Sequence, residues 1–229
     1  MQTSGRAIAA GVHLFTALGA VVALLAARAV IAHDWEGLFA WLGVALIIDG
    51  ADGPLARSVN VTSRLPGFSG ERLDWIIDYL TYVFIPAMAL VEAGFLPGVG
   101  GLAVAGLVLT SSLYHFCDVS NKSDDGCFVG FPAIWNIVAF YCFAIGFSST
   151  LTIVLTVILV VLTFVPLKWV HPVRSRWLRS WTAVATLIWT VAAITVVATG
   201  LPASWPLQLI LGAIAIYGIA VSVAHGMAR

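Results

Sequence analysis

The stretch IIDGADGPLARSVNVTSRLPGFSGERLDWIIDYL, residues 47–80, joins two apolar segments of the chain and holds four aspartates. Asp49 and Asp52 are three positions apart, and Asp74 and Asp78 are four apart, so each pair lies on one face of a helix. Carboxylates at a membrane edge are costly unless positive charge neutralises them, and oxygen-rich clusters suit hard divalent cations. The stretch therefore predicts two helices that meet at a metal site.

The composition around this stretch is that of a membrane protein. Of 229 residues, 61% are hydrophobic and 10% are charged, which is too apolar for a soluble domain. Apolar stretches, most of them near the roughly 20 residues that a spanning helix needs, occupy residues 12–32, 35–57, 73–91, 98–115, 132–148, 149–165, 181–199 and 205–224. The fifth and sixth are short, which leaves six or seven spans open. We predict an all-α integral membrane protein of about eight transmembrane helices, forming one domain over residues 1–229.

Basic residues predict the orientation, because Lys and Arg near span ends favour the cytoplasmic side. With a cytoplasmic N-terminus and eight alternating spans, ten of the eleven Lys and Arg residues lie inside and only Arg28 lies outside. The same count places the four aspartates at the cytoplasmic ends of the second and third spans. The net charge is zero, so the basic excess that nucleic-acid phosphates require is missing and no nucleic-acid partner is expected.

Small and basic residues continue the two aspartate faces. The first face runs through Asp49, Asp52, Gly53, Ala56 and Arg57, and the second through Gly70, Asp74 and Asp78. Small side chains beside metal ligands let a bulky ligand such as a nucleotide approach the backbone. Arg57 adds a cation suited to phosphate. The alternative is a structural network in which the aspartates pair with Arg57, Arg64 and Arg72.

These eight residues match the signature of the CDP-alcohol phosphotransferases, DxxDGxxAR followed by GxxxDxxxD, and the stretch resembles that family. One departure is the spacing: residues 58–69, twelve in all, separate Arg57 from Gly70, more than is usual in the family. The longer spacing resembles the bacterial phosphatidylcholine synthases, which join choline to CDP-diacylglycerol. The resemblance implies a core of six helices, a homodimer, and a place in the bacterial inner membrane with the active site facing the cytoplasm.

The resemblance also implies a mechanism. Two divalent ions, Mn²⁺ or Mg²⁺, are expected on Asp49, Asp52, Asp74 and Asp78, bridging the diphosphate of CDP-diacylglycerol. Asp78 is expected to be the general base that takes the hydroxyl proton of choline. Nucleotide and diphosphate contacts are assigned to Asp49, Asp52, Gly53, Ala56, Arg57, Gly70 and Asp74.

A second stretch, SSLYHFCDVSNKSDDGCFVGFPAIWN at residues 111–136, suits a quaternary ammonium. Choline cannot donate hydrogen bonds from nitrogen, so cation–π contacts of about 0.5 to 2 kcal/mol each would hold it. The residues predicted to bind choline are Tyr114, Phe116, Asp118, Phe128 and Trp135. The alternative for these aromatic residues is an ordinary role as anchors at the membrane interface.

Two other functions compete with this interpretation. A related phosphotransferase could use serine, glycerol phosphate or inositol phosphate, and Arg64, Arg72 and Lys122 could serve a phosphorylated acceptor. A divalent-cation transporter would instead line a path through the membrane with carboxylates. The predicted fourth to eighth spans contain no Asp or Glu, which disfavours the transporter.

Overall fold

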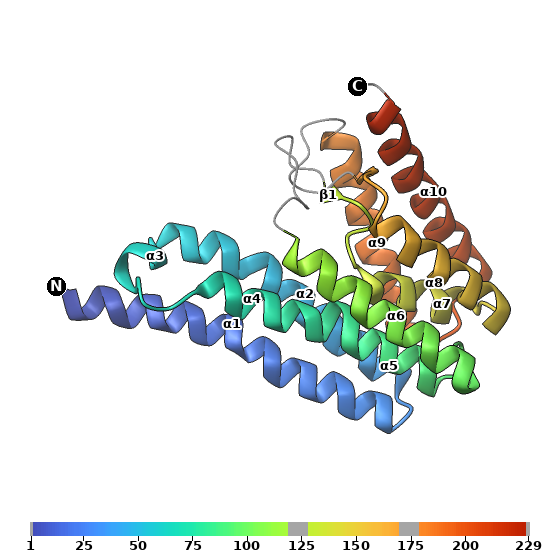
Figure 1. The fold of residues 1–229 in the computed structure, drawn as a ribbon, viewed down its shortest axis with the longest axis horizontal. Helices are drawn as coiled ribbons and strands as arrows, with labels where there is room; N and C mark the ends of the chain where they lie inside the picture. The colour runs from blue at the N-terminus through green and yellow to red at the C-terminus, as the bar shows by residue number, and fades with distance from the viewer. Residues whose placement is uncertain (1, 119–127, 170–178, 228–229) are drawn as a thin grey trace.

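The described part of the chain is almost entirely helical, as predicted. The structure is a computed structural model, and it describes residues 2–118, 128–169 and 179–227. Its helices are α1 (Gln2–Ile31), α2 (Trp35–Ser58), α3 (Val61–Arg64), α4 (Gly70–Asp78), the π-helix η1 (Tyr79–Phe84), α5 (Ile85–Glu92), α6 (Gly98–Cys117), α7 (Trp135–Ile145), α8 (Ser149–Thr163), α9 (Arg179–Thr199) and α10 (Trp205–Met227) (Figure 1). The two-residue strands β1 (Phe128–Val129) and β2 (Lys168–Trp169) pair antiparallel.

All eight predicted apolar segments form helices, but they differ in length. Among the described residues, six helical stretches are long and apolar enough to cross a membrane: Gly5–Ile31, Trp35–Ser58, Gly70–Glu92, Gly98–Cys117, Ser180–Thr199 and Trp205–Ala224. The fifth and sixth segments give the shorter helices α7 and α8, of 11 and 15 residues. At ~1.5 Å per residue these extend only about 16 and 22 Å, less than the ~30 Å hydrocarbon core of a bilayer. The protein is a multi-pass membrane protein.

The N-terminal helices form one bundle around α1. Helix α1 packs along α2 and α4 and also contacts α3, η1 and α5. Figure 1 shows α1, α2 and the α4–α5 helix lying lengthwise beside one another, with α9 and α10 on the far side of the molecule. Helix α2 contacts α9, and α9 packs on α10.

A large apolar core closes the end of the bundle away from the predicted site. Leu38, Phe39 and Leu42 in the first half of α2 belong to it, and Phe39 packs edge-on against Phe140 and Phe143 of α7 with ring centroids 5.3 and 5.2 Å apart. Packing of this kind, rather than exclusion of water, holds helices together in lipid. The core therefore fixes the first half of α2, and the second half contains Asp49 and Asp52.

Two helices differ in detail from the prediction. Helix α1 begins at Gln2, ten residues before the apolar stretch that starts at residue 12, because helical hydrogen bonding continues through good helix formers such as Ala and Arg. The third span is a single helix whose middle turns are π-helical, and the sequence pattern does not predict that. Helix α2 runs through Pro54 to Ser58.

Candidate active site

Two facing helices bring three of the predicted aspartates together. Asp49 from α2 and Asp74 and Asp78 from α4 each offer one carboxylate oxygen, and these oxygens all lie within 4.8 Å of one another. All three residues are half-buried. Carboxylates so close repel one another, and a cation among them removes that repulsion. We call Asp49, Asp74 and Asp78 the aspartate cluster; its hard oxygen donors fit a divalent cation.

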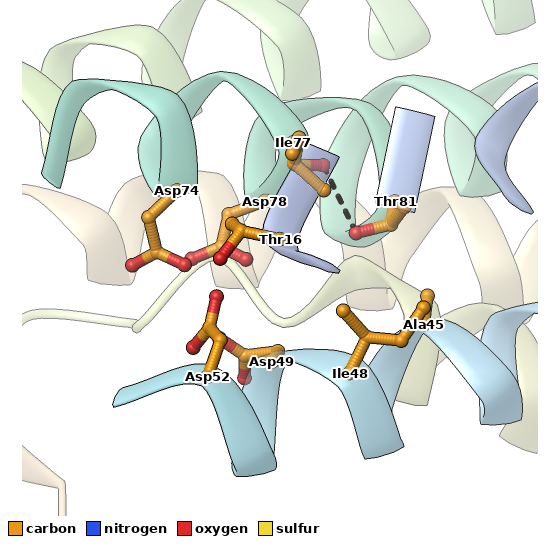
Figure 2. A pocket seen from close by; sticks show the side chains of 9 residues that line it. All are labelled: Thr16, Ala45, Ile48, Asp49, Asp52, Asp74, Ile77, Asp78 and Thr81. Carbon is orange, nitrogen blue, oxygen red and sulfur yellow. Dashed lines mark hydrogen bonds between the residues drawn. The ribbon is translucent and has the colours of Figure 1, made fainter. Parts of the chain in front are cut away.

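Asp52 lies beside the aspartate cluster but is not one of its three members. Its side chain is only 7% exposed, and it lines the same pocket as the cluster. In Figure 2 the carboxylates of Asp74 and Asp78 point toward α2, and that of Asp52 points back toward α4. The two predicted faces therefore meet as expected.

The pocket has a third wall, from α1, that the sequence pattern does not reveal. Thr16 lines it together with Ala45, Ile48, Ile77 and Thr81. The hydroxyl of Thr16 donates to the carbonyl of Val12 at 3.3 Å, and that of Thr81 donates to Ile77 at 3.0 Å. Both hydroxyls thus form hydrogen bonds within their own helices, and the polarity of the pocket comes from the carboxylates.

The twelve residues between Arg57 and Gly70 build the connection that turns the chain back on itself. Asn60, with φ of 54°, adopts the left-handed conformation and starts the four-residue helix α3, whose Val61 is buried. Ser69 then caps α4 by accepting a hydrogen bond from the backbone N–H of Arg72 at 3.2 Å. This cap sets where α4 begins and so where Asp74 and Asp78 lie along it.

The two glycines of the signature have different neighbours. A Cβ atom on Gly53 would lie 3.3 Å from Nη1 of Arg57, so the exposed arginine folds back over that glycine. A Cβ atom on Gly70 would lie 2.7 Å from Cε1 of His13, an α1 residue whose imidazole also packs on Phe68 with centroids 4.4 Å apart. Ala56 is half-buried on the same turn of α2 as Gly53. The cytidine contacts assigned to these residues stay a prediction.

A tyrosine that the sequence analysis did not single out also reaches the site. The hydroxyl of Tyr82, in η1, donates a hydrogen bond of 2.7 Å to Oδ2 of Asp49. The signal was present in the sequence, because Tyr82 follows Asp74 and Asp78 at a further step of four residues.

The residues predicted to bind choline lie in different surroundings. Tyr114 is 55% exposed and packs against Phe164, with ring centroids 5.1 Å apart. Trp135 is fully buried, and its indole N–H donates to Oγ of Ser112 at 2.9 Å. Phe116 is half-buried and meets the ring of Tyr79 edge-on, with centroids 6.3 Å apart.

The rest of the predicted choline loop is only partly described. Asp118 follows the last residue of α6 and is half-buried. The backbone of Phe128 belongs to β1, but its side chain lies outside the described residues, as do Lys122, Asp124 and Asp125. Choline binding by this loop stays a prediction.

Fold and site together define a helical, multi-pass membrane protein whose spans present an aspartate cluster suited to a divalent cation. The chain is 47% identical over 187 residues to the phosphatidylcholine synthase of Bradyrhizobium diazoefficiens, covering 81% of this chain and 70% of that relative. It belongs to the phosphatidylcholine synthase family and is an enzyme. The resemblance drawn from the aspartate signature is thereby confirmed.

Other relatives give the same result. The phosphatidylcholine synthase of Pseudomonas aeruginosa is 41% identical over 192 residues, covering 84% of this chain and 81% of the relative. That of Rhizobium johnstonii is 41% identical over 179 residues, covering 78% and 74%. No protein-family model matches the chain.

Proposed function

We propose that this protein is a phosphatidyltransferase that condenses CDP-diacylglycerol with choline to give phosphatidylcholine and CMP. Its membership of the phosphatidylcholine synthase family supports phosphatidylcholine as the product. The observation that carries the chemistry is the aspartate cluster, in which three carboxylate oxygens from two facing helices lie within 4.8 Å. Such a site suits a substrate with a diphosphate, because a divalent cation links carboxylate and phosphate oxygens.

The aspartates are proposed to hold two ions, Mn²⁺ or Mg²⁺. Asp49, Asp74 and Asp78 supply the close set of oxygens, and the buried carboxylate of Asp52 supplies a fourth ligand in the same pocket. When bound, the ions neutralise the diphosphate and favour the departure of CMP. The protein itself fixes the carboxylates, through the cap on α4 and the apolar core on α2.

Asp78 is proposed to act as general base. Its carboxylate takes the proton of the choline hydroxyl, the choline oxygen bonds to the phosphorus that carries diacylglycerol, and the bond from that phosphorus to the CMP oxygen breaks. A positioned base typically contributes about 10²- to 10⁴-fold in rate. A direct displacement is proposed because no Ser, His or Cys lies within the signature residues to form a covalent intermediate.

The proposed substrates are of two kinds, and they require a site that both can reach. The acyl chains of CDP-diacylglycerol stay in the bilayer, whereas CDP and choline are water-soluble, so the site has to lie near one membrane surface. Gly53, Ala56, Gly70 and Arg57 are proposed to accommodate cytidine and diphosphate there. The distribution of Lys and Arg supports a cytoplasmic surface, and in a bacterium this is the inner membrane.

A homodimer is also proposed. Its support within the chain is the run of small residues GVGGLAVAG at 98–106, since small residues let membrane helices approach closely. Mass measurement of the detergent-solubilised protein tests it, and a purely monomeric active enzyme would contradict it.

One assay tests the acceptor. Purified protein is supplied with CDP-diacylglycerol, Mn²⁺ or Mg²⁺, and radiolabelled choline, serine or glycerol phosphate in separate reactions. We expect labelled lipid from choline, one CMP released for each lipid formed, and loss of both products when EDTA removes the metal. Labelled lipid from serine alone would show that the acceptor assignment is wrong.

A further inference from the structure

The third span changes its helical geometry directly after the last aspartate. Residues Tyr79–Phe84 form the π-helix η1, whose hydrogen bonds run from residue i to i+5 instead of i+4. Such turns are rare and occur often at functional sites. Because a π-turn holds more residues than an α-turn, it changes the direction in which residues after Asp78 point.

Tyr82 is the residue that this turn directs toward the site. Its hydroxyl crosses from η1 to α2 and donates to Oδ2 of Asp49 at 2.7 Å. That length is typical of a strong hydrogen bond from a hydroxyl to an ionised carboxylate. Its ring packs against a buried apolar cluster that includes Val83, Val108 and Trp135. The ring is therefore held by the core while the hydroxyl holds the carboxylate.

We propose that Tyr82 is a positioning residue that orients Asp49 as a metal ligand, an inference that rests on the proposed function. An ionised carboxylate has about four lone-pair sites on two oxygens. The hydrogen bond from Tyr82 occupies one of them and restricts rotation of the group. A carboxylate oxygen of Asp49 held in this way lies within 4.8 Å of an oxygen of Asp74 and of Asp78. Hydrogen bonds of this kind to metal ligands commonly govern metal affinity.

The same π-turn provides a matched control. Tyr79 is three residues before Tyr82 and also uses its hydroxyl, but it donates to the backbone carbonyl of Leu109 on α6 at 3.2 Å. Removing either hydroxyl deletes one oxygen atom and one hydrogen bond from η1. Only the loss at Tyr82 changes a bond to the aspartate cluster.

The test measures metal binding without substrate. Purified wild-type protein, Y82F and Y79F are titrated with Mn²⁺, and free Mn²⁺ is quantified by electron paramagnetic resonance. We expect Y82F to raise the Kd for Mn²⁺ by about 10- to 100-fold and Y79F to leave it unchanged. In activity assays, excess Mn²⁺ is expected to restore much of the kcat of Y82F, which a packing defect would not permit.

The outcomes separate the two proposals. A wild-type Kd in Y82F, or equal weakening in Y82F and Y79F, overturns the role of Tyr82 and leaves the metal-dependent transferase intact. Wild-type protein that binds no Mn²⁺ and no Mg²⁺ overturns both the proposed metal site and the role of Tyr82 in it.

Discussion

The N-terminal bundle and the last two helices of this protein are packed very differently. In the span Gly70–Glu92, 44% of an apolar stretch of 18 residues is buried inside the protein, whereas only 11% of the corresponding stretch is buried in Ser180–Thr199 and in Trp205–Ala224. The first region holds the aspartate cluster, and the described residues of α9 and α10 contain no Asp or Glu. Precise placement of charged groups thus goes with dense packing, and the exposed helices face their surroundings with apolar side chains.

The largest effect that would sharpen this contrast is expected at Asp78. The substitution Asp78→Asn removes the proposed base with little change of shape, so turnover is expected to fall by about 10²-fold or more while CDP-diacylglycerol still binds. Glu71→Gln is the matched control, because Glu71 is an exposed acid in the first turn of the same helix. Choline transfer rates and binding of radiolabelled CDP-diacylglycerol check both variants. Wild-type turnover in D78N would contradict the assignment.

The next effect concerns Gly70. In Gly70→Ala the new methyl carbon would lie 2.7 Å from Cε1 of His13, so either the His13 ring or the helices α1 and α4 have to shift, at a cost of about 1 to 3 kcal/mol. We expect a lower thermal inactivation midpoint and lower activity. The same change at Gly212 in α10, where a Cβ atom would meet nothing within 4 Å, is expected to lower neither.

A double variant distinguishes packing from nucleotide access at Gly70. If contact with His13 explains the defect, His13→Ala should recover the stability of G70A. A double variant that is stable but still binds CDP-diacylglycerol weakly would instead support the proposed approach of cytidine at Gly70.

A smaller effect is expected where the two regions are joined. Oε1 of Glu36 in α2 accepts a hydrogen bond of 2.9 Å from the backbone N–H of Leu201, in the connection between α9 and α10. Glu36→Ala should lower stability by about 1 kcal/mol because that N–H loses its partner. Thermal inactivation measures it, with choline transfer at low temperature expected to stay normal. Loss of activity at all temperatures would show that the last two helices influence the site.

The smallest effect is expected on the exposed face of α10. Leu209 is 63% exposed, so Leu209→Ala should change stability by less than about 0.5 kcal/mol and leave activity unaltered. A large loss of activity or stability would break the contrast, since it would mean that this face packs against a partner.

The sequence predicted the helices and the meeting of the two aspartate faces because both follow from local spacing. Runs of apolar residues set the helix positions, and steps of three and four residues place Asp49 with Asp52 and Asp74 with Asp78. The family resemblance then indicated the chemistry, and the relatives confirmed the family. Predicting these features does not require knowing how helices that are distant in the sequence pack together.

Features that depend on such approach were not predictable. Thr16 and His13 come to the site only because α1 packs against α2 and α4, and each resembles an ordinary residue of an apolar helix. The π-turn has no simple sequence pattern, so the bond from Tyr82 to Asp49 could be suspected from spacing but not inferred. The choline contacts stay a prediction, because the four described residues lie in different surroundings and the side chain of Phe128 lies outside the described part of the chain.

The shortness of α7 and α8 has a consequence for the surrounding bilayer. Most residues of α7 are buried inside the protein, among them Trp135, Phe140 and Phe143, so little of this helix faces lipid. Helix α8, with 15 residues, is also shorter than the hydrocarbon core, yet it presents Leu151, Val154, Ile158 and Val161 outward. The hydrophobic mismatch between protein and lipid therefore falls on α8. We therefore expect a thinner bilayer to match α8 better than a thick one.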